Sequence, residues 1–107
     1  CIGTNDDDIV SAINAVVEVK GGLSVSKNKK IEVLPLPVGG IMSDQPAEKV
    51  AKEYEKLSQL VRSWDCTMSA PFMTLSFMAL LVIPELKLGD SGLFDVRIFR
   101  NTELFLD

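Results

Sequence analysis

Apolar residues near the start of the chain recur at the spacing of a helix. They lie three or four residues apart, with two valines alongside, at Ile9, Ile13, Val16, Val10 and Val17. Thr4 stands where a helix cap is expected, and the aspartates at positions 6–8 suit the positive end of the helix dipole. Gly21-Gly22 is predicted to end the helix, because glycine readily adopts the left-handed conformation of a C-terminal cap.

A β-hairpin is predicted directly after this helix. Leu23 and Val25 alternate with serines, Ile31 and Val33 alternate with charged residues, and the polar stretch 27–29 forms the turn. The first three residues resemble the end of a strand that is already under way, so we expect the chain to be a fragment of a longer protein.

A second helix is predicted from Gln45 or Pro46 to about Trp64, with Asp44 or Gln45 as its cap. Its apolar stripe consists of Ala47, Val50, Tyr54, Leu57, Val61 and Trp64. The preceding residues 35–43, PLPVGGIMS, are too rich in proline and glycine to form a regular helix or a central strand.

Residues 71–88 are almost entirely apolar, and their pattern leaves helix and strand open. Residues 72–78 have the length of a short buried helix, and residues 80–83 resemble a buried strand that Pro84 interrupts. Periodicity does not separate the two structures across residues 72–83.

The end of the chain is predicted to contain a turn at residues 89–92, an irregular stretch at 93–100 and a last strand at 103–106. Hairpins mixed with helices, without regular alternation of strand and helix, predict an α+β fold. In that fold a largely antiparallel sheet packs against two main helices. The length of 107 residues fits one domain, 1–107.

Charge and cysteine content exclude several classes of protein. The net charge is −4, and we interpret the basic cluster at residues 27–30 as a solvated hairpin tip, so no nucleic-acid partner is expected. The longest apolar run, residues 77–83, is far shorter than the ~18 residues of a membrane-spanning helix, so no membrane partner is expected. No signal peptide is visible, and Cys1 and Cys66 are predicted to be free, buried thiols in a reducing, cytoplasmic environment.

The sequence contains no histidine, and this removes most catalytic chemistry. Zinc sites rest largely on His and Cys ligands, and a Ser-His-Asp triad needs its histidine. The aspartates at 6–8 point in different directions on a helix and are interpreted as capping residues. Gly39-Gly40 lacks the lysine and the third glycine of phosphate-binding loops. No catalytic, cofactor-binding or metal-binding residue is predicted.

Some large side chains admit two interpretations. The four methionines are expected to fill a core rather than to line a groove; they are Met42, Met68, Met73 and Met78. For Trp64, an interface anchor and a residue at the edge of the core are equally supported.

Three blocks of sequence, in order along the whole chain, carry a family resemblance. They are IGTND from Ile2, PLPVGGIMSDQPAEKV from Pro35, and PFMTLSFMALLVIPELKL from Pro71, the last followed by GLFDV. In these blocks the chain resembles the C-terminal domain of microbial adenine deaminases of the amidohydrolase superfamily. It departs at Leu81, where the family often has proline, and at residues 39–41, where the family often has Ala-Gly-Leu.

The resemblance implies a parent enzyme that hydrolyses adenine to hypoxanthine and ammonia. In that enzyme a hydroxide bound to Fe, Mn or Zn attacks C6 of the ring. The metal ligands and acid–base groups of the family belong to an N-terminal (β/α)₈ barrel, and none maps onto a residue of this sequence. By itself the chain is therefore expected to be inactive and to hold no cofactor.

Two functions are compatible with these expectations. The first is a non-catalytic domain whose apolar segments, 35–43 and 71–83, pack on the barrel of the same chain or on a second subunit of a homo-oligomer. The second is an autonomous module that binds a small ligand such as a purine, with Ser43, Asp44 and Thr74 as the polar residues that orient it.

Overall fold

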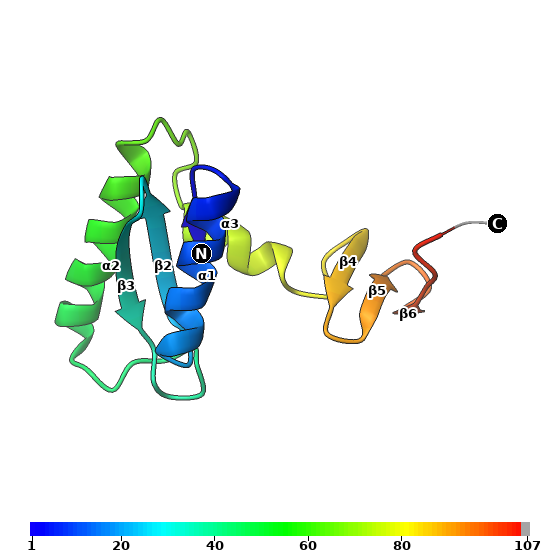
Figure 1. The fold of residues 1–107 in the computed structure, drawn as a ribbon. Helices are drawn as coiled ribbons and strands as arrows, with labels where there is room; N and C mark the ends of the chain where they lie inside the picture. Colours follow the sequence, from blue (N-terminus) through cyan, green and yellow to red (C-terminus); the bar gives the residue numbers. More distant parts are fainter. Residues whose placement is uncertain (106–107) are drawn as a thin grey trace. The chain divides into compact units, whose positions relative to one another are not determined.

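Two compact units make up the chain, Cys1–Ser69 and Ala70–Asp107. A computed structural model describes residues 1–105 (Figure 1). The first unit contains a three-stranded sheet and two helices, and the second contains a short helix followed by a three-stranded sheet. The α+β class is confirmed, with the strands divided between two small sheets.

The sheet of the first unit consists of β1 (Ile2–Gly3), β2 (Gly22–Lys27) and β3 (Lys30–Pro35), in that order. β1 runs parallel to β2, with α1 (Asp6–Glu18) between them, and β2 runs antiparallel to β3. This confirms the predicted hairpin, whose turn residues Asn28 and Lys29 have φ values of 53° and 64°. Two consecutive positive φ values are the geometry of a type I′ turn, which matches the twist of the strands.

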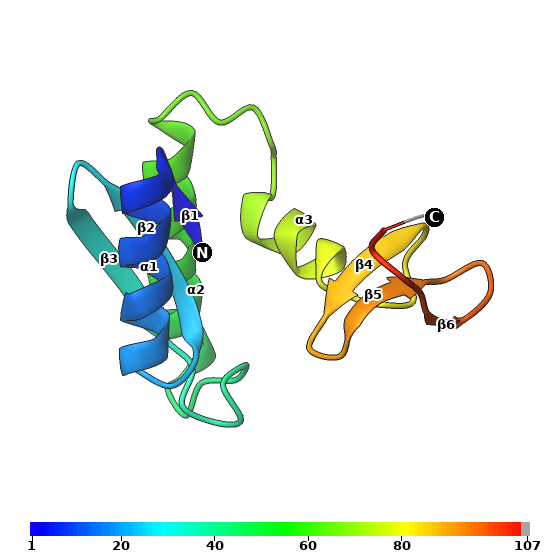
Figure 2. The same cartoon turned by 45° about the vertical axis from the view of Figure 1, so that its right-hand side comes forward.

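The two faces of this sheet contact different helices, because side chains alternate along β2. The Ser24 hydroxyl donates a hydrogen bond to the carbonyl oxygen of Ala12, on α1, at 2.7 Å. The fully buried Val25 lies on the face of α2 (Ala47–Arg62), near Leu60. Figure 2 shows α1 in front of the sheet and α2 behind it. The apolar core lies largely on the α2 face, with Val25, Leu34, Leu57 and Val61 buried.

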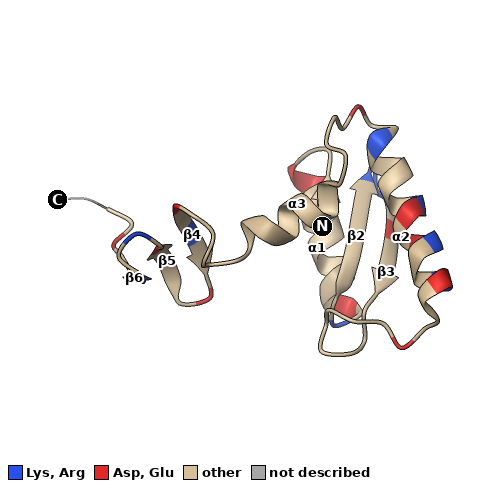
Figure 3. Ribbon diagram, turned by 180° about the vertical axis from the view of Figure 1, so that it is seen from behind, with Lys and Arg blue, Asp and Glu red and all other residues tan. Residues whose placement is uncertain are grey.

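The outer side of α2 is charged (Figure 3). The Nζ atom of Lys56 lies 2.7 Å from a carboxylate oxygen of Glu32, on β3, which raises the pKa of Lys56. Arg62 pairs with Glu55 along the helix at 3.1 Å. These ion pairs are exposed, so each contributes little to stability.

α2 begins directly after Pro46, whose carbonyl oxygen accepts hydrogen bonds from the N–H groups of Lys49 at 3.0 Å and Val50 at 3.2 Å. Pro46 is therefore the cap, and it has no side chain that can bond to the helix. The prediction that Asp44 or Gln45 caps this helix is wrong.

The helix α1 packs with its small and polar side towards the sheet. Asp8 and Ala12 are buried on that side. The opposite side carries larger aliphatic residues, all exposed: Ile9, Val10, Ile13 and Val17. The predicted helix is confirmed. Apolar stripes of helices usually face the core, but most of this stripe faces away from it. Small residues allow a close approach, since a Cβ on Gly3, in β1, would overlap the backbone of α1 at Ile9.

Asn5, and not Thr4 as predicted, caps α1. Its side-chain oxygen accepts a hydrogen bond from the backbone N–H of Asp8 at 2.9 Å. The Thr4 hydroxyl donates instead to the Asp8 carboxylate at 2.6 Å, and the Asn5 side-chain nitrogen donates to the same carboxylate at 3.0 Å. The side chains of Thr4 and Asn5 thus both donate hydrogen bonds to Asp8.

The Asp8 carboxylate also fixes the tip of the β2–β3 hairpin. It accepts hydrogen bonds from the Ser26 hydroxyl at 3.1 Å and from the backbone N–H groups of Asn28 at 3.1 Å and Lys29 at 3.0 Å. Asp8 is only 2% exposed. These hydrogen bonds stabilise the charged form of the carboxylate, and the bond from the Thr4 hydroxyl has the largest effect. The pKa of Asp8 therefore falls to about 2.

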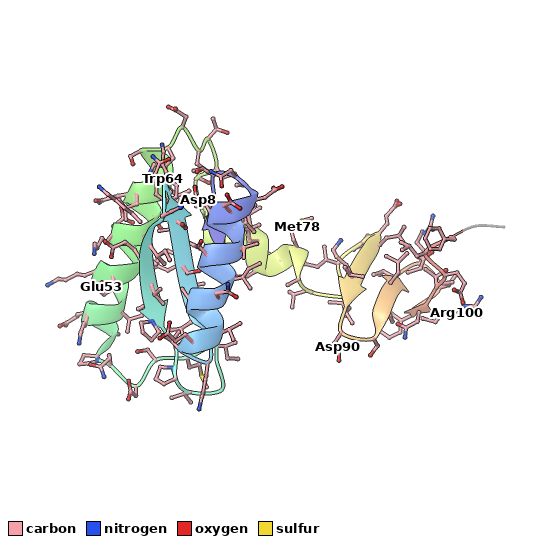
Figure 4. The ribbon with its side chains drawn as sticks, in the orientation of Figure 1. Asp8, Glu53, Trp64, Met78, Asp90 and Arg100 are labelled. Carbon is pink, nitrogen blue, oxygen red and sulfur yellow. The ribbon has the colours of Figure 1, made fainter. Side chains whose placement is uncertain are left out.

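Trp64 follows α2 and is partly buried. The Nζ atom of Lys27, on β2, lies 5.6 Å from the centroid of its ring, which is a cation–π contact. Figure 4 shows Trp64 and Asp8 at the same end of the sheet. Within this unit Trp64 is a residue at the edge of the core.

The second unit contains α3 (Pro71–Met78), β4 (Leu86–Gly89), β5 (Gly92–Asp95) and β6 (Arg100–Asn101). Its strands form an antiparallel meander in sequence order. Of the two alternatives for residues 72–78, the structure has the helix. The predicted turn at 89–92 is confirmed, since Gly89 pairs with Gly92.

The predicted strand at residues 80–83 is wrong. The N–H of Leu80 bonds to the carbonyl oxygen of Phe77, and the N–H of Ile83 bonds to that of Leu80, each at 3.2 Å. These bonds close two successive turns, so the backbone of this apolar segment is not available for a sheet.

The end of the chain also differs from the prediction. Residues 93–95 are not irregular but belong to β5, which pairs with both neighbouring strands. Residues 103–105 form no strand. The last strand, β6, lies earlier in the sequence than predicted, at Arg100–Asn101. Leu106, which the prediction included, lies outside the described residues.

Polar groups hold the meander together. The buried Asp95 carboxylate accepts hydrogen bonds from Nη2 of Arg97 at 2.7 Å and from its Nε at 3.0 Å, and this guanidinium lowers the pKa of Asp95. The buried Lys87 ammonium donates to the carbonyl oxygens of Pro84 at 3.0 Å and Leu86 at 3.3 Å.

Replacing the buried carboxylate should change how stability depends on pH. The pKa of Asp8 is about 2 in the folded chain, against 3.8 for an ordinary aspartate. Its contribution to stability is therefore full above about pH 4 and is lost as the pH falls towards 2. Asp8→Asn is expected to lower the melting temperature at pH 7, and the gap to the original chain should close between pH 4 and pH 2. Thermal unfolding followed by circular dichroism measures this.

Asp7→Asn is the control, because Asp7 is an exposed neighbour in the same turn. It should leave the pH dependence unchanged. A gap between Asp8→Asn and the original chain that stays constant from pH 7 to pH 2 would contradict the role given to this carboxylate.

Candidate functional site

The loop between β3 and α2 is fixed by backbone hydrogen bonds despite its glycines. At its start, the N–H of Leu36 donates to the carbonyl oxygen of Gly21 at 3.0 Å. Its tip is closed by two bonds between Val38 and Met42, at 3.0 and 3.1 Å. A Cβ on Gly21, whose φ is 129°, would overlap the backbone of Gly40. The two glycines therefore allow the loop to contact the end of α1.

Two of the predicted site residues, Ser43 and Asp44, line a cavity of about 320 Å³ behind this loop. The cavity is lined by apolar residues of β3, the loop and α2 and by a polar group at 43–45 and on α2. These are Val33, Leu34, Pro35, Pro37 and Val50, and Ser43, Asp44, Gln45, Lys49 and Glu53. Its size and its mixed lining are compatible with a small ligand that has apolar and polar groups.

The polar side of the cavity is a short chain of hydrogen bonds. The N–H of Gln45 donates to the Ser43 hydroxyl at 3.1 Å, and the Gln45 side-chain nitrogen donates to the Asp44 carboxylate at 2.9 Å. The Lys49 ammonium donates to the Gln45 side-chain oxygen at 3.1 Å. These groups orient one another, and they offer donors and acceptors but no nucleophile paired with a base.

Thr74, the third predicted residue, does not join them. It lies on α3, in the second unit, and is exposed. Its hydroxyl donates to the carbonyl oxygen of Ala70 at 3.0 Å, within the same helix. The structure therefore brings together only Ser43 and Asp44.

Three residues of this cavity were missed by sequence reasoning. Lys49 and Glu53 are spaced by four residues, so they lie on one side of α2, where Figure 4 labels Glu53, and Gln45 precedes the helix and accepts a hydrogen bond from the Lys49 ammonium. That spacing was visible in the sequence. The path of the loop could not be predicted from the sequence. This path brings Ser43 and Asp44 to the same cavity as the polar residues of α2.

An open groove of about 640 Å³ is also lined by the loop and by α2. Its lining is mostly apolar and includes Ile41 and Met42. Both are exposed, and so are the other methionines, Met68, Met73 and Met78. The prediction that the methionines fill a core is wrong, because they lie on a loop, on a connection and on the open sides of a short helix.

Residues 1–105 contain no group of three His, Cys, Asp or Glu side chains that could hold a metal ion. In the same residues no helix is long and apolar enough to cross a membrane. The cysteines at positions 1 and 66 are free thiols, as predicted, but the prediction that they are buried is wrong, because Cys1 is exposed and Cys66 is partly exposed. The metal chemistry that the family resemblance implies does not fit the side chains described here.

Comparison with known proteins finds relatives over the whole chain. Residues 1–100 match the family model described as adenine deaminase C-terminal domain. The adenine deaminase of Methanosarcina barkeri is 51% identical over 104 residues, which are 97% of this chain and 19% of that protein. That of Salinibacter ruber is 49% identical over 107 residues, 99% of this chain and 19% of the relative. The chain thus spans about a fifth of the length of these curated relatives. No solved structure matches.

The contact between Gly21 and Gly40 predicts unequal effects of two alanine substitutions. Gly21→Ala places a Cβ on the backbone of the loop in addition to the strain of a positive φ, so it should lower the free energy of unfolding by about 2–3 kcal/mol. Gly39→Ala is the control: its φ is 63°, but its Cβ would meet nothing within 4 Å, and a loss of about 1 kcal/mol is expected. Denaturant unfolding compares the two, and equal losses would contradict the close contact.

Proposed function

This chain belongs to the adenine deaminase C-terminal domain family, as its three sequence blocks predicted, and we propose that it is a non-catalytic packing domain of a longer adenine deaminase. The longer protein hydrolyses adenine to hypoxanthine and ammonia, in the cytoplasm, with a metal-activated water whose metal is Fe, Mn or Zn. The ligands of that metal belong to a barrel that precedes this domain. The role of this domain is to pack on that barrel or on a second subunit of a homo-oligomeric enzyme.

The surface of the second unit carries this proposal. Leu88 is 79% exposed and Phe99 is 68% exposed. They are accompanied by other exposed apolar side chains, among them Met73, Phe77, Met78, Val82, Leu86, Ile98, Leu104 and Phe105. Soluble monomers rarely expose contiguous apolar patches larger than a few hundred Å². This surface is therefore expected to be covered.

The interior of the same unit is small and partly polar. The buried residues among those described in it are Pro71, Phe72, Lys87 and Asp95. Lys87 and Asp95 are charged, and their hydrogen bonds offset the cost of burial without adding an apolar core. Since burial of apolar area is the main driving force of folding, the unit depends on apolar surface from elsewhere.

The preceding region of the longer protein is the best candidate to supply that surface. The relatives are about five times as long as this chain, so most of each enzyme lies outside it. A region on the same polypeptide is present at high effective concentration and binds without a second encounter.

Removing one of these exposed side chains should matter only in the longer protein. Leu88→Ala is expected to lower the free energy of unfolding of the longer protein by about 2 kcal/mol, because a buried leucine side chain is truncated. In the isolated chain the change should stay within about 0.5 kcal/mol, because Leu88 is exposed there. Denaturant unfolding of both proteins measures the difference.

Asp90→Ala, in the turn of the same hairpin, is the matched control and should have little effect in either protein. Equally small effects of Leu88→Ala in both proteins would count against the packing role.

A second function is favoured by one observation, the cavity that Ser43 and Asp44 line together. In this alternative the domain binds a small purine there, with the Asp44 carboxylate accepting from the ligand and the Ser43 hydroxyl orienting it. Thr74 would take no part in binding at that cavity, because its hydroxyl is bonded within α3.

Thermal unfolding in the presence of adenine or hypoxanthine tests this alternative. Binding should raise the melting temperature of the chain, and Asp44→Asn should abolish the rise while Asp90→Asn retains it. No stabilisation by either purine at millimolar concentration would sink it.

A further inference from the structure

A second cavity of the first unit lies at the tip of the β2–β3 hairpin, at the end of the sheet where Figure 4 labels Trp64. Its volume is about 240 Å³. It shares no residue with the cavity at Ser43 and Asp44. Apolar side chains form one part of its lining and polar side chains the other; they are Val25, Leu60 and Trp64, and Lys27, Asn28, Lys30 and Glu32.

Two lysines of this lining stand directly opposite each other on the hairpin. Lys27, the last residue of β2, pairs with Lys30, the first residue of β3. Side chains at such positions leave the same face of the sheet, with Cβ atoms about 5 Å apart, and like charges there destabilise the hairpin. Because both side chains line the cavity, their positive charges act on the same space.

The described residues, 1–105, provide no carboxylate that forms an ion pair with either of these lysines. Glu32, the acidic residue of the lining, is bound to the ammonium of Lys56, on α2, at 2.7 Å. The Nζ atom of Lys27 lies instead over the Trp64 ring, 5.6 Å from its centroid. The cavity therefore has an excess of positive charge beside an apolar wall.

The backbone of the hairpin tip is fixed from the other face of the sheet. The Asp8 carboxylate accepts hydrogen bonds from the N–H groups of Asn28 at 3.1 Å and Lys29 at 3.0 Å, the two residues between the opposed lysines. Lys27 and Lys30 thus begin from backbone positions that are already held in place. Since the N–H groups of the turn are occupied, an anion in the cavity would be bound by the lysine side chains.

We propose that this cavity binds a small phosphate monoester that carries a planar ring, such as a nucleoside monophosphate. The phosphate lies between the ammonium groups of Lys27 and Lys30, and the ring packs on the apolar wall of Trp64 and Leu60. A phosphate monoester has a charge of about −1.5 to −2 at pH 7, so it matches two lysines better than a carboxylate does. The volume is below the ~300 Å³ at the lower end of ligand pockets, which leaves room for one ring system.

The charge of the whole chain favours a small ligand at this site. With a net charge of −4, the chain would repel a long polyanion such as RNA. The proposal goes beyond the packing role and does not rest on it. All residues of the cavity lie in the first unit, whereas the exposed apolar surface that supports the packing role lies in the second.

Trp64 is the single tryptophan of the chain, so its fluorescence reports on this cavity directly. Titration of the chain with adenosine monophosphate should change this fluorescence until the site is saturated. Adenosine lacks the phosphate and inorganic phosphate lacks the ring, so each should bind about tenfold more weakly or less. No saturable change with adenosine monophosphate, or equally tight binding of adenosine or of inorganic phosphate, would overturn the proposal.

Removing one lysine of the pair tests the position of the phosphate. Lys30→Gln should weaken the binding of adenosine monophosphate about tenfold, because a charged hydrogen-bond donor is lost. Lys29→Gln is the matched control: it removes the same charge from the same turn, but Lys29 is not part of the lining, so binding should be retained. Circular dichroism checks that both variants are folded. Equal weakening by both would show a general attraction to the hairpin tip and would overturn the site.

The same variant should have the opposite effect on the stability of the chain without ligand. Lys30→Gln removes the like-charge pair and should raise the melting temperature slightly, while adenosine monophosphate should stabilise the original chain more than the variant. A residue with a purely structural role would not produce this reversal. A lower melting temperature of Lys30→Gln without ligand would contradict the unfavourable pair on which the proposal stands.

Asp44→Asn separates this site from the purine cavity of the alternative function. The substitution lies outside the lining of the Trp64 cavity, so the fluorescence response to adenosine monophosphate should be unchanged. Loss of the response in Asp44→Asn would place the ligand in the other cavity and would overturn this proposal. The Leu88→Ala comparison tests the packing role independently of both cavities.

Discussion

The first unit depends on one buried carboxylate. Asp8 accepts hydrogen bonds from the start of its own helix, from β2 and from the β2–β3 turn, so one side chain joins two regions that are distant in sequence. The backbone N–H groups of Asn28 and Lys29, which a tight turn leaves without strand partners, find their acceptor there. The carboxylate can do this only if α1 turns its polar side inwards.

That orientation determines what the surface of the domain looks like. With Asp8 and Ala12 against the sheet, the aliphatic residues of α1 have to face outwards. The second unit repeats this arrangement by other means, since charged groups are buried in its meander while Leu88 and Phe99 are exposed. Polar hydrogen bonds thus lie on the α1 face of the first sheet and inside the meander, where a self-sufficient domain has apolar contacts, and apolar side chains lie where such a domain has polar ones. A domain built this way is suited to be one layer of a larger protein.

Much of the local structure could be predicted from the sequence, because helix periodicity and strand alternation are local properties. Both main helices and the hairpin were found, and the three sequence blocks gave the family. The side of α1 that is buried could not be predicted, since that depends on Ser24 and Ser26 presenting hydroxyl groups on the facing strand. The strand predicted at residues 80–83 failed for a related reason: an apolar run forms a strand only where another strand pairs with it. In the cavity, Ser43 and Asp44 were found because they are polar and near a loop, whereas Lys49 and Glu53 depend on how the loop folds back on α2.

The most direct test of whether the apolar surfaces are covered in the longer protein is the oxidation of methionines by hydrogen peroxide. Met73 and Met78 are exposed in this chain, and the rate of sulfoxide formation follows exposure. Peptide mass spectrometry can compare these rates in the isolated chain and in the longer protein. A packing domain should show both methionines protected in the longer protein, by about tenfold or more. Equal rates in the two proteins would contradict the packing role, since the surface would then be open in the longer protein as well.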